Sequence, residues 1–453
     1  MLSIPADSSE RPLPFMFSDL TVLELASVLA GPSVGQFFAE WGATVIKVEN
    51  PRTEGDVTRR WTTPKNGGET ESPGDEDDRS AYFCACNHGK QSLALDLSTG
   101  DGRALLHDLV EDVDVVLASF RSGTAEALGA DYETLSDLNP ALLYGHVTGY
   151  GPADERPGYD AAIQAESGLM SINGLADGPP MKLPVALMDV LAAHQLKEGL
   201  LMALLRRERT GDGAYVPVSL LQAAVSGLVN QATNYLVGDH VPRRMGSRHP
   251  NIAPYGTAYE TFDDRAVVLA VGTDRQFEAL CHIIGTEALP QNPNFATNEA
   301  RVEHRDVLER VLTVRIRQME AAPLLDALEE ARVPAAEARS IDAVFDQPAA
   351  DAMVLRPEDD LAGLRQSAFA LDSSRHGSPK DSGKNPADGA PADGPDRVST
   401  GSASPGSAVA LAPAPHYAEH TASLLQQRGF RPADIHTLAD NGVIDLPETV
   451  GSN

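Results

Sequence analysis

The chain has 453 residues, of which 42% are hydrophobic, and its 65 acidic and 36 basic residues give a formal net charge of −29 at pH 7. This length is sufficient for two or three domains with a sizeable core. The negative charge disfavours binding to nucleic acids and anionic membranes, which repel an acidic surface. No run of about 18 apolar residues indicates a transmembrane helix, and residues 1–15 do not resemble a secretory signal. We therefore expect a cytoplasmic protein.

The charged residues also indicate the solvent in which the protein works. Only seven of the 36 basic residues are lysine. An acidic, lysine-poor surface around an ordinary core favours a halophilic protein, because high salt screens repulsion between surface charges over a few ångströms. An acidic protein from a low-salt organism is the alternative.

The three cysteines, Cys84, Cys86 and Cys281, are too few to form a disulfide framework. Cys84 and Cys86 form a C-x-C pair with no second cysteine and histidine cluster nearby. We therefore expect no metal site, and we predict that both thiols lie on a buried strand.

Two βαβ patterns organise the first third of the chain. The first has a strand, a turn, a helix and a strand, at 20–25, 30–32, 35–41 and 44–48. The second has a strand, a helix and a strand, at 91–97, 101–111 and 113–117, and a further strand follows at 142–147. These patterns predict an α/β fold whose parallel sheet is buried on both faces.

The rest of the chain contains a long helix, a second α/β segment and a low-complexity stretch. The long helix is expected at 189–207, and 215–221 is a strand or the start of a helix. The second α/β segment, 245–345, has expected strands at 257–262 and 266–271 and helices at 274–284, 301–319 and 323–331. Residues 372–410 are rich in Ser, Gly, Pro, Asp and Ala, which predicts a disordered insertion. A final amphipathic helix is expected at 416–429.

No common nucleotide or hydrolase motif is present. The first strand-to-helix turn, LASVLAGPSVG, lacks G-x-G-x-x-G, and the chain has no P-loop, H-E-x-x-H or G-x-S-x-G. A ligand can still bind at the carboxyl ends of parallel strands, where residues 27–32 lie. Another unusual feature is Asp189, a lone carboxylate in the uncharged stretch VALMDVLAAHQ. From these residues alone, a helix cap or a solvated acid explains Asp189 as well as a catalytic role does.

Several long motifs, in order, resemble the class III CoA-transferases of the CaiB/BaiF family. They are DLTVLELASVLAGPSVGQFFAEWGATVIKVENPRTEGDVTRRW (19–61), CNHGKQSLALDL (86–97), LNPALLYGHVTGYG (138–151), RPGYDAAIQAESGLMSINGLADGPP (156–180), ALLRRERTGDGAYVPVSLLQA (203–223) and GSRHPNIAPYGTAYET (246–261). The resemblance spans about residues 19–370 and resumes near 415–430.

The resemblance implies a Rossmann-like large domain, a smaller α/β domain and an interlocked homodimer. The implied domains are residues 1–225 for the first part of the large CoA-binding domain, 226–350 for the small domain with its linkers, and 351–453 for the return to the large domain. In such a dimer the active site forms between the large domain of one chain and the small domain of its partner.

The resemblance also assigns the nucleophile to Asp189. Its carboxylate would attack an acyl-CoA, forming a mixed anhydride and then an aspartyl-CoA thioester. The CoA thioester is a substrate, and neither a further cofactor nor a metal is expected. The expected partners are an acyl-CoA and a small carboxylic acid, with CoA moving from succinyl-CoA to a dicarboxylate such as mesaconate. Carnitine-like, bile-acid and aromatic acids are the alternatives.

Residues that bind CoA follow from the same resemblance. The backbone of Val28, Leu29 and Ala30 would line the thiol arm, although the family often has glutamine where this chain has Leu29. Arg59 and Lys90 match basic positions near the nucleotide, and a surface ion pair is the alternative for each. Phe120 and Arg121, in SFRSG, match a segment on the adenine side.

Four further residues are implied near the reacting groups. Tyr159 and Asp160 match a pair beside the nucleophile, and Arg248 and His249 are candidates for holding the acceptor's second carboxylate or for a dimer contact. An α-methylacyl-CoA racemase is an alternative function, but racemases have histidine where this chain has Tyr159. A CoA-binding protein without catalytic activity is the second alternative.

Overall fold

The computed structural model describes residues 16–62, 77–358, 360–371 and 411–447. The chain forms two compact units. The first contains residues up to Tyr159, then Met188–Ala223, then Ala349 to the end, and the second contains Asp160–Leu187 and Ala224–Pro348. Residues 160–187, which we expected in the large domain, belong to the second unit. The expected insertion at 372–410 lies outside the described residues.

A six-stranded parallel sheet forms the centre of the first unit, with strand order β3-β2-β1-β4-β5-β6. Its strands are β1 (Thr21–Leu25), β2 (Thr44–Glu49), β3 (Lys90–Ala94), β4 (Val115–Ala118), β5 (Leu143–Thr148) and β6 (Ala214–Ser219). The first five agree with the expected strands within a few residues. The order reverses between β1 and β4, which creates a topological switch point of the kind where doubly wound sheets bind ligands.

Helices and short connections surround this sheet. They are α1 (Ala30–Glu40), η1 (Pro51–Thr53), η2 (Val57–Arg60), α2 (Ala81–Cys84), α3 (Gly100–Val110), α4 (Thr124–Ala127), α5 (Tyr132–Leu138), α8 (Leu187–Thr210), α17 (Thr421–Gln427) and α18 (Pro432–Asp440), with α9 (Leu220–Gly227) and α16 (Pro348–Asp351) at the unit boundaries. A small hairpin joins β10 (Val354–Leu355) to β11 (Gly363–Leu364).

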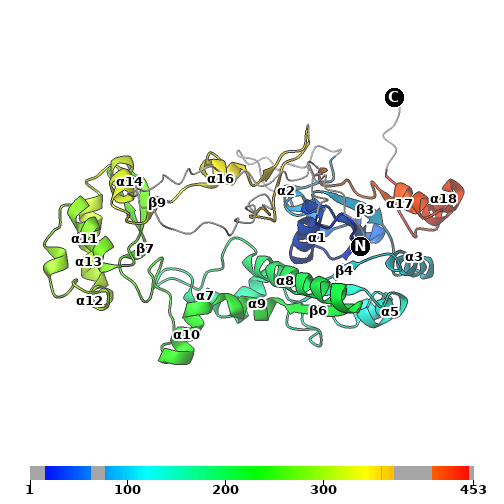
Figure 1. Ribbon diagram of the computed structural model, residues 1–453, viewed down its shortest axis with the longest axis horizontal. Helices are drawn as coiled ribbons and strands as arrows, with labels where there is room; N and C mark the ends of the chain where they lie inside the picture. The colour runs from blue at the N-terminus through cyan, green and yellow to red at the C-terminus, as the bar shows by residue number, and fades with distance from the viewer. Residues whose placement is uncertain (1–15, 63–76, 359, 372–410, 448–453) are drawn as a thin grey trace, which may run out of the picture. The chain divides into compact units, whose positions relative to one another are not determined.

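The end of the chain completes the first core. Leu424, Leu425, Ile435 and Ile444 pack in the same buried cluster as Leu23 of β1. Figure 1 shows α17 and α18, in red, near β3, in blue, although more than 300 residues separate them in sequence. Burying apolar surface from both ends of the chain therefore makes the stability of the first unit depend on residues after 411.

Three local predictions were wrong. Residues 30–32 form the first turn of α1 rather than a turn before it, because a proline is tolerated where helical N–H groups have no partner. The helix expected at 301–319 is divided at His304 into α12 (Asn298–Glu303) and α13 (Arg305–Ile316). Cys84 ends α2 and Cys86 follows it, so neither lies on a strand, although both thiols are buried.

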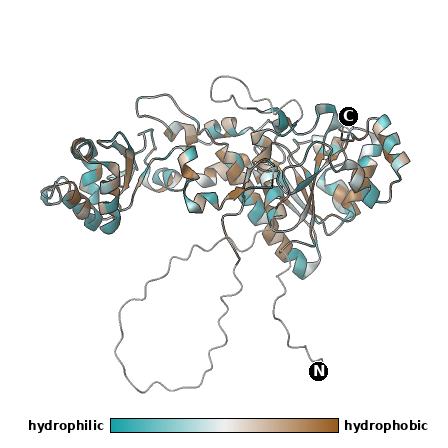
Figure 2. Cartoon of the chain, turned by 90° about the horizontal axis from the view of Figure 1, so that it is seen from above, coloured by the Kyte–Doolittle hydropathy of each residue, from teal (hydrophilic) through white to brown (hydrophobic). Residues whose placement is uncertain are grey.

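The second unit contains a three-stranded antiparallel sheet with order β7-β8-β9. Its elements are α6 (Asp160–Glu166), α7 (Leu169–Ile172), α10 (Val229–Gly238), β7 (Tyr255–Glu260), β8 (Ala266–Ala270), α11 (Asp274–Ile283), η3 (Leu289–Gln291), α12, α13, α14 (Ala321–Glu330), β9 (Ala335–Glu337) and α15 (Ile341–Val344). Phe277, Leu308 and Leu324 belong to its own buried core. Its helices carry both brown and teal residues in Figure 2, as expected for helices with one face on a core.

Within the described residues, no helix combines the length and the apolar character that crossing a bilayer requires. The longest, α8, has 24 residues, but it includes Lys197, Glu198 and several arginines. Its buried side chains recur at helical spacing, from Met188 through Ala192 and Leu196 to Leu200 and Ala203. The helix therefore covers a core with one face.

Candidate active site

A pocket of about 470 Å³ lies at the carboxyl ends of the central strands of the first unit. Its lining includes Leu25 at the end of β1, Glu49 at the end of β2, Leu95 just after β3 and Phe120 just after β4. These strands flank the switch point between β1 and β4. Parallel sheets commonly bind ligands there because the strand order leaves a crevice between the connecting loops.

The loop between β1 and α1 forms one wall of this pocket through Ala26 and Ser27. Val28, the next residue, has φ = 71°, which is a left-handed conformation that β-branched residues rarely adopt. Such a conformation costs about 1–3 kcal/mol and persists only where surrounding contacts hold it. The backbone N–H of Val28 donates to the Asp56 carboxylate, at 3.3 Å from Oδ2. The segment predicted to line the thiol arm is therefore a strained, anchored loop.

Arg59 does not present its charge to the pocket, contrary to the expected role. Its guanidinium bonds Glu49 through two nitrogens, with Nη2 2.7 Å from Oε1 and Nε 2.8 Å from Oε2. Nη1 bonds Asp78 and the carbonyl of Pro415. Burial opposes the charged form of Arg59, but Glu49 and Asp78 outweigh it and raise the pKa of the guanidinium. The ion-pair alternative therefore applies, but the pair is buried rather than on the surface.

Lys90 is also internal, which corrects the second expected phosphate contact. Its Nζ lies 2.7 Å from Glu24 Oε2, 2.9 Å from the carbonyl of Pro32 and 2.8 Å from Asn87 Oδ1. Because these three acceptors use all three ammonium protons, Lys90 has none left for a ligand.

A second buried lysine, Lys47, continues this network and lies on the pocket lining. Lys47 Nζ is 3.0 Å from Glu24 Oε1, 2.9 Å from Asp56 Oδ2 and 3.0 Å from the carbonyl of Ala26. Burial raises the pKa of a carboxyl, but Lys47 outweighs this effect and lowers the pKa of Asp56 to about 2. Burial also disfavours the Lys47 ammonium, but Asp56 and Glu24 raise its pKa overall. Both groups are therefore charged at neutral pH.

The cations that remain at the pocket are two arginines that the sequence analysis did not single out. Arg52 and Arg60 line the pocket, and their side chains are 64% and 57% exposed. Arg52 bonds Asp96 with Nε, and Arg60 is paired with Glu54. Both lie in PRTEGDVTRR, the segment that also contains Arg59.

Phe120 and Arg121 lie next to each other, but only Phe120 lines the pocket. Arg121 is exposed. The carbonyl of Phe120 accepts a hydrogen bond from His146 Nε2 at 2.8 Å, and the Tyr215 hydroxyl lies 2.7 Å from His146 Nδ1. Because a carbonyl only accepts, Nε2 carries the proton and Tyr215 donates to Nδ1. Burial lowers the pKa of His146, which favours this neutral form.

Asp189 is the third residue of α8 and lies in its first turn. It is half-buried. The positive end of the helix dipole stabilises a carboxylate at this position. Because the chain enters the first unit at Met188, Asp189 is the second residue after a crossing between units. The pocket and Asp189 thus belong to the same unit.

Tyr159 and Asp160 lie at the other chain crossing, where the first unit ends and the second begins. Tyr159 is 64% exposed. Asp160 is the first residue of α6, and its Oδ2 accepts from Gln164 Nε2 at 2.7 Å. Gln164 is fully buried, and its Oε1 accepts from the N–H of Leu183 at 2.8 Å. Gln164 therefore ties Asp160 to the loop that precedes α8.

Arg248 and His249 lie before β7 in the second unit. Arg248 bonds Asp306 and Glu309, so two carboxylates already balance its charge. Its predicted role of holding an acceptor carboxylate is therefore not supported by its surroundings. His249 Nδ1 accepts from the N–H of Asn251 at 3.1 Å. Burial, assisted by the charge of Arg305, lowers the pKa of His249 and favours a neutral ring.

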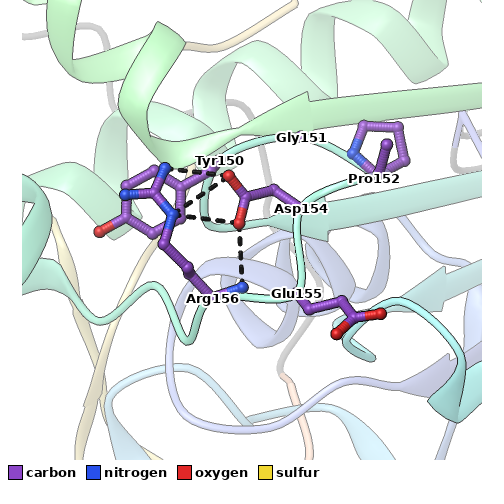
Figure 3. A pocket seen from close by; sticks show the side chains of 7 residues that line it. Tyr150, Gly151, Pro152, Asp154, Glu155 and Arg156 are labelled. Atoms are coloured by element: carbon purple, nitrogen blue, oxygen red, sulfur yellow. Dashed lines mark hydrogen bonds and ion pairs between the residues drawn. The ribbon is translucent and has the colours of Figure 1, made fainter.

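A second hollow, of about 640 Å³, is lined by the loop Tyr150–Arg156 (Figure 3). The Arg156 guanidinium lies over the Tyr150 ring, 3.7 Å from its centroid, and Nη2 is 2.9 Å from Asp154 Oδ2. One loop provides the lining, and its arginine is bonded within that loop. We assign this hollow no role in the chemistry.

The model of CoA-transferase family III matches residues 17–390, which is most of the chain. The chain belongs to CoA-transferase family III. This match confirms the resemblance that the sequence motifs indicated. It also identifies the chain as an enzyme that transfers CoA.

This family III enzyme is similar to relatives whose names state the acids between which they transfer CoA. It is 40% identical to a succinate–glutarate CoA-transferase of Agrobacterium fabrum, over 75% of this chain and 84% of the relative. It is 36% identical to a succinyl-CoA:mesaconate CoA-transferase of Haloarcula hispanica, over 73% and 82%. Among solved structures, a CaiB/BaiF family protein from Brucella suis aligns with TM-score 0.70 and 35% identity, over 90% of this chain and 98% of that one.

One group of potential metal ligands occurs among the described residues of the enzyme. Asp77, Asp78 and His416 place one ligand atom each within 4.8 Å of one another. Both carboxylates already pair with arginines, Asp77 with Arg79 and Asp78 with Arg59. Ion pairs within the first unit therefore account for the cluster.

Proposed function

We propose that this family III enzyme transfers CoA from an acyl-CoA to a free carboxylic acid through a covalent intermediate on Asp189. The supporting observation is the pocket at the switch point of the sheet, with Arg52 and Arg60 on its lining, in a chain whose family transfers CoA. The guanidinium groups suit the phosphates of CoA, which bind arginine through charge-assisted hydrogen bonds. The loop 26–30 suits the narrow thiol arm.

The chemistry requires only exchanges between activated carboxyl groups. The Asp189 carboxylate attacks the thioester carbonyl and expels CoA thiolate, which leaves an acyl-aspartyl anhydride. The thiolate then attacks the aspartyl carbonyl, which releases the donor acid and forms aspartyl-CoA. The acceptor carboxylate attacks this thioester, and the returning thiolate attacks the new acyl group, which regenerates Asp189. No ATP or further cofactor enters this sequence.

We propose succinyl-CoA as the donor and a C4 or C5 dicarboxylate as the acceptor, with mesaconate and glutarate as the first acids to test. The names of the two relatives support this choice, because both contain a succinate or succinyl group and a second dicarboxylate. The paired state of Arg248 leaves His249 as the remaining candidate of that pair for the acceptor's distal carboxylate.

We also propose that the enzyme functions as a homodimer. Helix α10 carries exposed apolar side chains, with Leu236 74% and Val237 87% exposed. Exposed apolar patches on a water-facing helix commonly mark an interface. A second copy of the chain fits such a patch, since most oligomers of identical chains are symmetric. Light scattering is expected to give twice the chain mass of 48.1 kDa.

The test combines succinyl-CoA with glutarate, mesaconate, oxalate or acetate, using wild-type enzyme, Asp189→Asn and Glu198→Gln. Glu198 is an exposed acid on the same helix, so its variant is the matched control. Hydroxylamine added during turnover attacks the aspartyl carbonyl of aspartyl-CoA, which releases CoA thiol and leaves an aspartyl hydroxamate that mass spectrometry locates. Reactions in deuterated water with a chiral 2-methylacyl-CoA detect racemase chemistry.

We expect transfer by wild type and Glu198→Gln, loss of at least about a thousandfold in Asp189→Asn, and modification at residue 189. Substantial transfer by Asp189→Asn, or modification at another residue, would refute the nucleophile assignment. Deuterium exchange without transfer would instead support the racemase alternative. CoA binding with neither reaction would indicate a binding protein.

A further inference from the structure

The buried ion pair between Lys47 and Asp56 holds both sides of the loop residue Ser27. Lys47 Nζ donates to the carbonyl of Ala26 at 3.0 Å, and Asp56 accepts from the N–H of Val28. The two side chains are themselves joined at 2.9 Å and are each 1% exposed. The ion pair therefore bonds the loop between β1 and α1 on both sides of Ser27.

Further buried hydrogen bonds hold Lys47 and Asp56 in place. Asp56 Oδ1 accepts from both the backbone N–H and the hydroxyl of Thr58, and its own N–H donates to Glu49 at 2.9 Å. Lys47 is fixed from its other side by Glu24. Groups with this many buried bonds have little freedom to turn toward a ligand. Lys47 and Asp56 line the pocket, but their charged atoms are directed to the loop and to each other.

The loop needs these bonds because Val28 has φ = 71°. A valine released from external bonds would return to negative φ, and this rotation would move the peptide groups on either side of it. Cys86 adds one weak contact, with Sγ 3.6 Å from the carbonyl of Val28. The contacts with charged groups that oppose the rotation come from Asp56 at Val28 and from Lys47 at Ala26.

We propose that Lys47 and Asp56 are positioning residues, which hold the backbone of residues 26–28 in the shape that the thiol arm of CoA requires. This inference rests on the proposed function, since it assumes that the arm lies along this loop. The pair is expected to act on the pantetheine end of CoA. The nucleotide end, beside Arg52 and Arg60, is expected to be unaffected.

The test compares two probes, CoA and adenosine 3′,5′-bisphosphate, which has the nucleotide end but no thiol arm. Asp56→Ala is expected to weaken CoA binding about tenfold, because misplaced contacts lose binding steeply, and to change binding of the truncated nucleotide by less than about twofold. Asp56→Asn keeps an acceptor oxygen and should lie between wild type and Asp56→Ala. It also serves as the folded variant if Asp56→Ala is unstable.

Rescue by glycine separates positioning from a general structural role. Glycine adopts φ near 70° without a steric penalty. Val28→Gly in the Asp56→Ala background is therefore expected to restore CoA binding to within about threefold of wild type. Asp131→Ala is the matched control. The Asp131 carboxylate accepts from the backbone N–H and the hydroxyl of Thr134, as Asp56 accepts from Thr58, but Asp131 lies outside the pocket lining. Its CoA affinity should equal that of wild type.

Hydrogen exchange of the unliganded enzyme provides a readout that does not depend on CoA. The Val28 amide should exchange faster in Asp56→Ala than in wild type and Asp131→Ala. The inference is overturned if Asp56→Ala weakens both probes equally, if glycine gives no rescue, or if exchange at Val28 is unchanged. If wild type binds neither probe, the proposed function fails, and the exchange result still decides whether Asp56 holds the loop.

Discussion

Lys90 Nζ lies 2.7 Å from Glu24 Oε2, and both side chains are fully buried. The two residues are 66 positions apart and meet because β1 and β3 flank β2 in one sheet. Burial lowers the pKa of Lys90, and the charge of Glu24 opposes this effect without outweighing it. A lysine that the sequence suggests for phosphate binding is thus part of the core that supports the pocket.

We predict that Lys90→Met destabilises the enzyme without changing its affinity for CoA. Breaking a buried ion pair leaves an uncompensated charge and typically costs about 3–5 kcal/mol. Urea unfolding should show this loss, while KM for acyl-CoA should stay within about threefold of wild type. Adding Glu24→Gln should recover part of the stability, because it removes the excess negative charge and leaves Lys47 paired with Asp56. A higher KM at unchanged stability would contradict the internal role.

Arg52→Gln and Arg60→Gln should each raise KM for acyl-CoA about five- to tenfold, since each removes a charge-assisted contact with phosphate. Their stabilities should remain close to wild type because both side chains are largely exposed. Higher KCl should reduce the difference from wild type through screening. Arg209→Gln, at the exposed end of α8, is the matched control. An equal effect of all three variants would indicate general charge rather than a phosphate site.

The stability of the enzyme should depend on pH through His146. Burial lowers its pKa below the usual value of 6.5, so between those two pKa values the unfolded chain binds a proton that the native ring does not. The stability that the neutral His146 ring contributes is fully present above pH 6.5 and is lost as the pH falls. Wild type should therefore lose more stability than His146→Gln between pH 7.5 and 5.5. Chemical unfolding at both pH values measures this loss. An equal loss of unfolding free energy in the two proteins would contradict the role of His146.

Salt should stabilise the enzyme. The net charge of −29 makes the folded chain repel itself at low ionic strength, and the Debye length falls to about 3 Å at 1 M salt. We expect the melting temperature to rise by about 5 °C or more between 0.1 and 2 M KCl. Sucrose at matched osmolarity is the control for non-ionic stabilisation. An unchanged or lower melting temperature in KCl would contradict halophilic adaptation.

Much of the first unit was predictable from local patterns. Five strands of the parallel sheet and helices α1 and α3 lie where the spacing of apolar residues and turn residues predicted them. The position of the loop between β1 and α1 at a pocket, which Ser27 lines, was also predictable, because parallel strands direct their carboxyl ends to one edge. The division of the predicted helix at His304 was not evident, since helical propensity is nearly continuous there.

The sequence by itself determined the family, through long motifs in order, and it marked the segment that contains Arg52, Arg59 and Arg60. Only the tertiary structure decided which of these cations face the pocket. Arg59 meets Glu49 inside the unit, whereas Arg52 and Arg60 remain largely exposed. The physical reason is that availability of a charge depends on burial and on partners brought together by the sheet, and neither is encoded in the spacing of neighbouring residues.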